Sequence, residues 1–273
     1  MQFIGIRETT VRQPAVAGTF YPAEPERLRA MVREFLADAA VPPLANVRAV
    51  IAPHAGYIYS GPTAGYAFKV WEAVPQRPRT IYLMGPAHYV YVSGIAVGRF
   101  RAFATPLGLV PVAEEMVDAL LDRDGPFVLA NNAHLPEHAL EVELPFLQEV
   151  FGNHMRIVPM LFGDVNPMEA VTALVELVQS DPNALIVVSS DLSHYHDYWT
   201  ARRLDTALLD AIVQGDIERA REGEACGLLP ILTLMGVAMR LGWQAHLLDY
   251  RNSGDTAGDK ARVVGYAAVA YAA

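Results

Sequence analysis

The chain has 273 residues, 52% of them hydrophobic, and it carries a formal net charge of −9 without any run of Lys or Arg. This length allows a sizeable core without disulfides, and the acidic balance excludes nucleic acid and anionic membranes as expected partners. The single Cys suits a reducing compartment, and without a membrane-span or signal-peptide pattern we expect a soluble, cytoplasmic protein.

The first half of the chain alternates helical patterns with short apolar runs. Residues 26–39 place apolar side chains at helical spacing, and residues 113–122 form a second helical pattern. The runs at 47–53 and 80–86 are nearly continuous rather than alternating, which predicts strands that are buried on both faces. The segment 94–108 is expected to add a hairpin or edge strands.

The second half continues this alternation. Helices are expected over residues 139–150, 167–179, 200–213 and 228–241. Strands are expected over residues 156–162, 184–190, 244–250 and 262–271. Because no linker or repeat interrupts the pattern, we predict a single α/β domain over residues 1–273, with a central, largely parallel or mixed β-sheet flanked by helices.

Three histidines follow predicted strands directly. His54, His88 and His194 each lie just past the end of an apolar run. Ligands bind at the carboxyl ends of the strands in open α/β sheets, so we expect these residues at one rim of the sheet. Three histidines there would suit a metal site or a proton-transfer site. The alternative is a set of hydrogen-bonded loop histidines, and no HExxH or CxxC pattern decides between the two.

The segment APHAGYIYSGPTAGYAF (52–68) combines glycines with Tyr57, Tyr59 and Tyr66. Glycines permit close backbone approach, and tyrosines bring an apolar body and a polar tip to a pocket wall. We expect Tyr57 in the wall of the pocket that contains His54. The alternative is a glycine-rich turn before a helix packed with aromatic residues.

The segment HLPEHALEVELPF (134–146) predicts a helix that begins near Glu137. Such a helix would place Glu137 and Glu141 roughly along one face, with His138 one position around. Carboxylates there would orient ligand histidines, so Glu141 and His138 are candidates for the pocket wall or for support of its ligands. The alternative is a solvated helix face with acids at its N-terminus, and this alternative is strongest for Glu143.

Cys226 stands just before the helix expected over 228–241. A helix N-terminus lowers the pKa of a thiol and favours the thiolate, which is the form that binds metal. The alternative is a small buried residue, which is the commonest fate of a lone Cys, and the residues alone favour it. The turn-rich residues 252–255 are expected to form a connecting loop.

Several of these segments together resemble the Memo family, whose prokaryotic relatives are described as protein B of an AmmeMemoRadiSam system. The motifs run nearly end to end: RQPAVAGTFYPAEPERL (12–28), APHAGYIYSGPTAGYAF (52–68), GPAHYVYVSGIAV (85–97), FATPLG (103–108), EHALEVELPFLQ (137–148), VVSSDLSHY (187–195) and YRNSGD (250–255). That family is similar in fold to the class III, LigB-like non-haem iron extradiol dioxygenases. The resemblance therefore implies a dioxygenase-like fold.

The resemblance also implies roles for individual residues. His54 and His88 match the two histidine ligands of the iron in those dioxygenases, and His194 matches their acid–base histidine. Cys226 stands in place of the carboxylate ligand, a departure that shifts the metal preference towards copper(I) or zinc, or towards a redox role. Asp191 is expected to hydrogen-bond His194, which would fix its tautomer, or a metal-bound water.

Three functions remain open at this point. The first is an oxidoreductase that uses one transition-metal ion, iron or copper or alternatively zinc, and acts on a small, phenolic substrate. The second is a non-catalytic module that binds a metal or a peptide. The third is a metal-assisted hydrolase with His194 activating water. The identity of the bound metal separates these functions.

Overall fold

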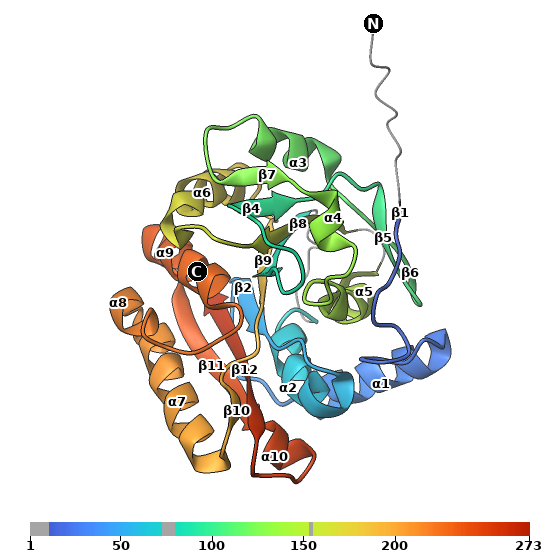
Figure 1. The fold of residues 1–273 in the computed structure, drawn as a ribbon, viewed down its shortest axis with the longest axis vertical. Coiled ribbons are helices and arrows are strands. Elements are labelled where there is room, and N and C mark those ends of the chain that lie inside the picture. The colour runs from blue at the N-terminus through green and yellow to red at the C-terminus, as the bar shows by residue number, and fades with distance from the viewer. Residues whose placement is uncertain (1–10, 73–79, 153–154) are drawn as a thin grey trace, which may run out of the picture.

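The computed structural model describes residues 11–72, 80–152 and 155–273, and it confirms the predicted α/β class (Figure 1). Its main sheet has nine strands in the order β10-β12-β2-β9-β3-β8-β4-β7, and β11 pairs with β12. These strands are β2 Val47–Ala52, β3 Thr80–Pro86, β4 Ile95–Val97, β7 Phe127–Leu129, β8 Arg156–Phe162, β9 Leu185–Ser189, β10 His194–His196, β11 Gln244–Asn252 and β12 Val263–Ala272. A small second sheet contains β1 Val11–Arg12, β5 Ala102–Thr105 and β6 Gly108–Pro111.

The centre of the main sheet is parallel and its flanks are not. Strands β2, β9, β3 and β8 pair in parallel, whereas β12 runs antiparallel to β2 and β4 runs antiparallel to β8. Every residue of β3 and β9 is buried, as the continuous apolar runs predicted. The sheet is therefore mixed, with a parallel core.

Helices cover both sides of this sheet (Figure 1). One group contains α1 Pro25–Asp38, α2 Tyr57–Lys69 and α5 Leu144–Phe151, which pack on one another. The other contains α6 Val171–Ser180, α7 Tyr198–Gln214, α8 Ile217–Ala220 and α9 Leu228–Leu241. The remaining helical segments are α3 Glu114–Leu121, α4 Asn131–His134, η1 Glu141–Glu143, η3 Pro167–Ala170 and α10 Ser253–Thr256.

The glycines of the segment 52–68 serve helix packing. Gly61 and Gly65 lie inside α2, where α2 crosses α1. A Cβ atom at Gly61 would lie 2.2 Å from the ring of Phe35, and one at Gly65 would lie 2.4 Å from the backbone oxygen of Phe35. The close backbone approach expected of these glycines is thus the approach of α1 to α2.

The helix expected to begin near Glu137 begins later. Residues 135–140 form a turn, η1 starts at Glu141, and the α-helix starts at Leu144. The carboxylate of Glu137 accepts hydrogen bonds from the backbone N–H groups of His138 and Ala139, which holds this segment in a turn instead of a helix. Glu137 and Glu141 therefore do not share a helix face, and that part of the prediction is wrong.

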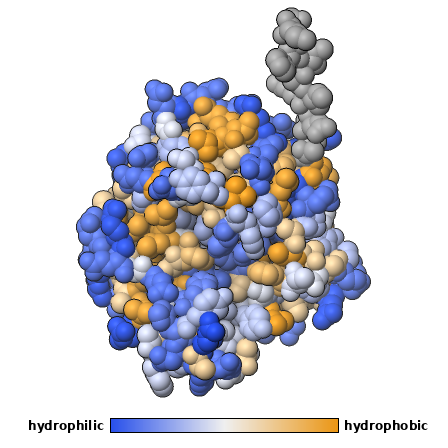
Figure 2. Space-filling view, in the orientation of Figure 1, coloured by the Kyte–Doolittle hydropathy of each residue, from blue (hydrophilic) through white to orange (hydrophobic). Residues whose placement is uncertain are grey.

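The surface shown in Figure 2 is mostly hydrophilic, with hydrophobic residues between hydrophilic ones and a larger hydrophobic group over β7. Val128 and Leu129 of that strand are exposed. In the part of the chain that the structure describes, no helix has both the length and the apolar character needed to cross a bilayer.

Candidate metal centre

The parallel core delivers three candidate residues to one edge of the sheet. Ala52, the last residue of β2, pairs with Ser189, the last residue of β9, and β3 lies on the other side of β9. His54, His88 and Asp191 each follow one of these strands by two residues. The register of the strands therefore places the three side chains at the same rim, as predicted for His54 and His88. His194, the third histidine expected at a strand end, instead begins β10, which pairs with β12.

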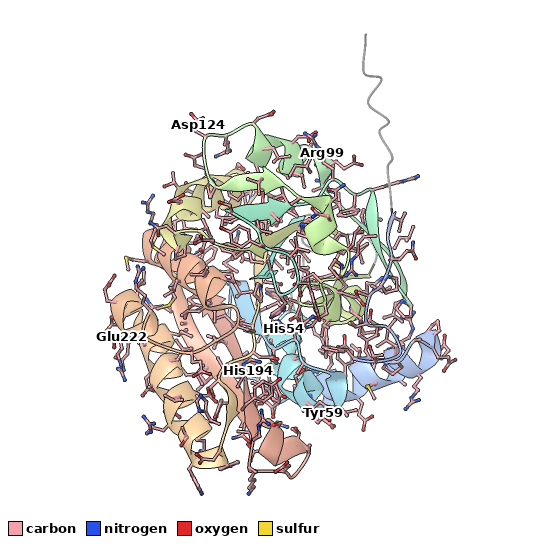
Figure 3. The ribbon with its side chains drawn as sticks, in the orientation of Figure 1. His54, Tyr59, Arg99, Asp124, His194 and Glu222 are labelled. Carbon is pink, nitrogen blue, oxygen red and sulfur yellow. The ribbon has the colours of Figure 1, made fainter. Side chains whose placement is uncertain are left out.

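A cavity of about 880 Å³ opens at this rim. Its walls include every residue for which a catalytic or metal-binding role is predicted, namely His54, His88, Asp191, His194 and Cys226. His54, Tyr59 and His194 lie close to one another near the middle of Figure 3, whereas Arg99, Asp124 and Glu222 lie at the periphery. The predicted convergence on one pocket is thus observed.

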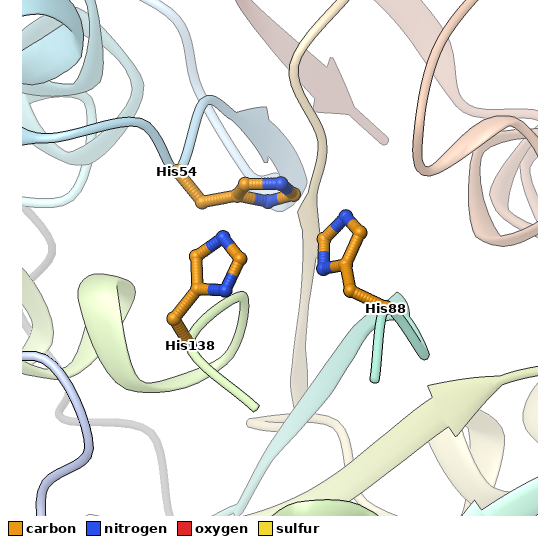
Figure 4. Close-up of side chains that lie close together, drawn as sticks. All are labelled: His54, His88 and His138. Carbon is orange, nitrogen blue, oxygen red and sulfur yellow. The ribbon is translucent and has the colours of Figure 1, made fainter. Parts of the chain in front are cut away.

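Three histidine rings in the cavity wall lie close together (Figure 4). The ring centroids of His54 and His88 are 5.3 Å apart, those of His54 and His138 are 5.4 Å apart, and those of His88 and His138 are 4.9 Å apart. Each ring offers one nitrogen, and these nitrogens lie within 4.8 Å of one another, so the cluster could hold one metal ion. Sequence analysis placed His138 in the wall or in support of the ligands, and the structure groups it with the other two histidines.

The buried histidines of this cluster are in the form that binds metal. Burial lowers the pKa of His54 to about 3, and repulsion from His88 in its protonated form adds to this effect. Burial lowers the pKa of His138 to about 4, and repulsion from His54 in its protonated form adds to this effect. Both rings are therefore neutral near pH 7, and a neutral imidazole nitrogen is the ligand that transition metals use.

The carboxylate of Glu137 holds two of the three histidines. It accepts the backbone N–H of His88 at 2.6 Å and the ring Nδ1–H of His88 at 2.9 Å, in addition to the N–H groups of His138 and Ala139. Burial alone would raise the pKa of Glu137, but the hydrogen bonds and charge of His88 outweigh it and lower this pKa to about 2. A ligand histidine whose second nitrogen donates to a carboxylate is fixed in tautomer and orientation.

We expect the Glu137→Gln variant to bind zinc ~10–100-fold more weakly than the unaltered chain. The amide of Gln keeps one acceptor oxygen but replaces the other by an NH₂ group. This group cannot accept the N–H groups that now donate to Glu137, so His88 loses its fixed orientation. Competition with a chelator measures the affinity. Equal zinc affinity in the two proteins would show that His88 needs no such support.

Cys226 lies beside His54, at the start of α9. Its Sγ atom is 3.2 Å from Nε2 of His54 and accepts the backbone N–H of Asp191 at 3.2 Å. The expectation that the helix start would lower the thiol pKa is wrong. Burial raises this pKa to about 12, and the negative charge of Asp191 adds to the rise, so the free thiol keeps its proton.

His194 and Asp191 are both in the cavity but do not bond in the expected way. Nδ1 of His194 lies 2.8 Å from the carbonyl oxygen of Leu192, so a carbonyl fixes its tautomer. Oδ1 of Asp191 instead accepts the backbone N–H of His54 at 2.8 Å. His196 pairs with Glu224 at 2.9 Å and lies outside the cavity wall.

Two other candidates lie behind the cavity wall. The hydroxyl of Tyr57 donates to the carbonyl oxygen of Val142 at 2.7 Å, and Tyr59 occupies the wall in its place. Glu141 accepts hydrogen bonds from the guanidinium of Arg12, the hydroxyl of Tyr21 and the N–H of Val16. It therefore holds residues 12–21, the N-terminal segment, in place.

Sequence reasoning missed two supporting residues, Arg12 and Ser189. Arg12 also donates to the carbonyl oxygens of His134 and Glu137 and so supports the turn that carries His138. Ser189 contacts the ring of His54 through Oγ. Neither residue type signals such a role locally, because both act on segments far away in the chain.

Comparisons with known proteins agree with the sequence motifs. A family model described as Memo-like protein matches residues 12–270. A MEMO1 family protein of Methanosarcina acetivorans is 38% identical, with 95% of this chain and 98% of the relative covered. A MEMO1 family protein of Sulfolobus acidocaldarius is 35% identical, covering 96% of this chain and 99% of the relative.

A solved structure supports the fold alone. The crystal structure of the uncharacterized protein JW3007 from Escherichia coli K12 superposes with a TM-score of 0.51 at 13% sequence identity. The match covers 82% of this chain and 99% of that chain.

Proposed function

The chain belongs to the Memo family, and from this membership we propose that it is a metal-dependent oxidoreductase related to the extradiol dioxygenases. The proposal rests on one observation above all, the meeting of His54, His88 and His138 in the wall of the cavity. A transition-metal ion held there would supply Lewis-acid and one-electron redox chemistry.

The residues present fit such an ion. His88 is oriented by Glu137 and His54 by Ser189, so each presents its other ring nitrogen to the cavity. We propose Cys226 as the further ligand, because its sulfur is 3.2 Å from Nε2 of His54. Imidazole suits iron, copper and zinc, and thiolate favours copper(I) and zinc. We propose iron or copper as the native metal, with zinc as the alternative, and a cytoplasmic location, which a single cysteine suits.

The cavity suits a small aromatic substrate. Phe20, Tyr59 and Tyr195 are among the residues that line it, and an apolar ring packs well against aromatic walls. His194 lies in the same wall, with its Nδ1 held by the Leu192 carbonyl, so Nε2 is left to take or give a proton. We propose a phenolic substrate whose hydroxyl proton is removed by His194.

One observation favours a second candidate, a metal-assisted hydrolase. Three histidines without a carboxylate are a donor set that zinc uses in catalytic sites. His194 would then act as the general base.

Oxygen uptake by anaerobically purified protein, with catechol as the phenolic probe, separates the two functions. The oxidoreductase consumes oxygen only with iron or copper bound, and its rate falls in the His194→Gln variant by ~10²–10⁴-fold. Hydrolysis of an activated ester by the zinc-loaded protein, with no oxygen uptake under any metal, would overturn the oxidoreductase in favour of the hydrolase.

A further inference from the structure

A second acidic residue, Glu143, lies beneath the histidine cluster in an unusual setting. It belongs to η1 and is 0% exposed. Its Oε1 atom is 2.7 Å from Oγ of Ser189, and its Oε2 atom has no hydrogen-bond partner in the described part of the chain. An ionised carboxylate buried in this way, with one oxygen unpartnered, would be costly.

The hydroxyl of Ser189 has three close polar neighbours. Its Oγ atom lies 2.6 Å from the carbonyl oxygen of Ala139, 2.7 Å from Oε1 of Glu143 and 2.8 Å from Nδ1 of His54. A serine hydroxyl has one hydrogen to donate and two lone pairs to accept with. Three bonds are therefore possible only if two of the neighbours bring their own hydrogen.

The carbonyl of Ala139 has no hydrogen to bring, so it must receive the one from Ser189. It follows that Glu143 and His54 each donate to Ser189. If Ser189 donated to Glu143 instead, two oxygen atoms would face each other at 2.6 Å without a hydrogen between them.

We propose that Glu143 is a neutral hydrogen-bond donor that, through Ser189, fixes the Nδ1–H tautomer of His54. Nε2 of His54 is then free to present its lone pair to the cavity, where Cys226 and the other histidines lie. The role of Glu143 and Ser189 in metal binding rests on the proposed function. The placement of one proton on Glu143 and one on Nδ1 of His54 does not. Glu143 and Ser189 are positioning residues, because they act through His54.

The electrostatics of Glu143 point the same way. Burial raises the pKa of Glu143 well above its usual range and outweighs the lowering effect of the hydrogen bond with Ser189, and the nearby charge of Asp191 adds to the rise. Glu137 provides the opposite case, since four N–H groups donate to its carboxylate and its pKa is lowered. One glutamate of this segment is thus a charged acceptor for His88, and the other is a neutral donor for His54.

The same substitution at the two glutamates provides a matched test. In Glu143→Gln the amide N–H group replaces the carboxyl O–H group as the donor to Ser189, so we expect unchanged zinc affinity. Ser189→Ala removes the acceptor of the Nδ1–H group, and Glu137→Gln removes a charged acceptor, so we expect each to weaken zinc binding by ~10–100-fold. Thermal melts of the three variants show whether each is folded.

Two measurements on the metal-free full chain read the protons directly. Nitrogen-15 NMR of the histidine rings should show His54 with its proton on Nδ1, and this signature should be lost in Ser189→Ala. Infrared spectroscopy should show a protonated carboxyl band that disappears in Glu143→Gln.

A His54 proton on Nε2, or a Glu143→Gln variant that loses as much zinc affinity as Ser189→Ala, would overturn the proposal. Because the spectra need no metal, they decide it even when the unaltered chain binds no zinc. Failure to bind zinc would count against the proposed function alone.

Discussion

Replacing Glu141 by Gln is expected to lower the free energy of unfolding by about 3–5 kcal/mol, because it leaves the guanidinium of Arg12 buried without its countercharge. Both side chains of this ion pair are 0% exposed. Glu141 also accepts the N–H groups of Ala15 and Val16, at 2.7 and 3.0 Å, and an amide satisfies fewer of these donors than a carboxylate. Denaturant unfolding of the metal-free protein measures the loss.

The ion pair between Arg156 and Glu115 supplies the matched control. It joins the same two residue types, but its side chains are 41% and 53% exposed. Glu115→Gln is therefore expected to cost less than about 1 kcal/mol. Similar losses in the two Gln variants would show that the Arg12–Glu141 pair does not hold the N-terminal segment as we infer.

The Cys226→Ser variant is expected to lose most of the affinity for zinc and the pH dependence of that affinity between pH 7.5 and 9. The raised thiol pKa of about 12 means that the proton of Cys226 must leave before the sulfur can coordinate. Lower pH opposes the release of the thiol proton. The zinc affinity of the unaltered chain should therefore increase about tenfold for each unit by which the pH is raised. Zinc titrations at several pH values measure the slope.

Cys226→Asp separates a ligand from a buried core residue. A carboxylate in the ligand position should keep metal binding and shift the preference towards iron(II). A buried Asp without a metal or a partner should instead lower the melting temperature sharply, because an unpaired buried charge is costly. If Cys226→Asp has a sharply lowered melting temperature and Cys226→Ser binds the same metals as the unaltered chain, Cys226 is not a metal ligand.

The sequence predicted the elements that have a strong periodic signal. The continuous apolar runs that became β2, β3 and β9 are buried on both faces, and α9 spans the predicted residues. The helix α2 was harder to predict, because Gly61, Pro62 and Gly65 are poor helix formers. Its glycines are required by the contact with α1, which no local pattern reveals.

Some features of the site could likewise be predicted from the sequence, and others could not. Strand-end positions were enough to bring His54 and His88 together, because parallel strands deliver their carboxyl ends to one rim, whereas His194 reaches the same cavity from β10. The place of His138 in the cluster could not be predicted, since the expected helix is a turn held by Glu137. The burial that raises the pKa of Cys226 depends on the packed structure, whereas the helix start beside it is visible in the sequence.

The most direct test of the metal centre is the metal content per chain of anaerobically purified protein, with His138→Ala and His246→Ala as a matched pair. His246 lies in β11, away from the cavity wall. We predict one transition-metal ion per chain in the unaltered protein and in His246→Ala, and a large loss in His138→Ala. An unaltered chain that neither carries nor takes up a metal ion, or a His138→Ala variant that retains it fully, would contradict the three-histidine centre.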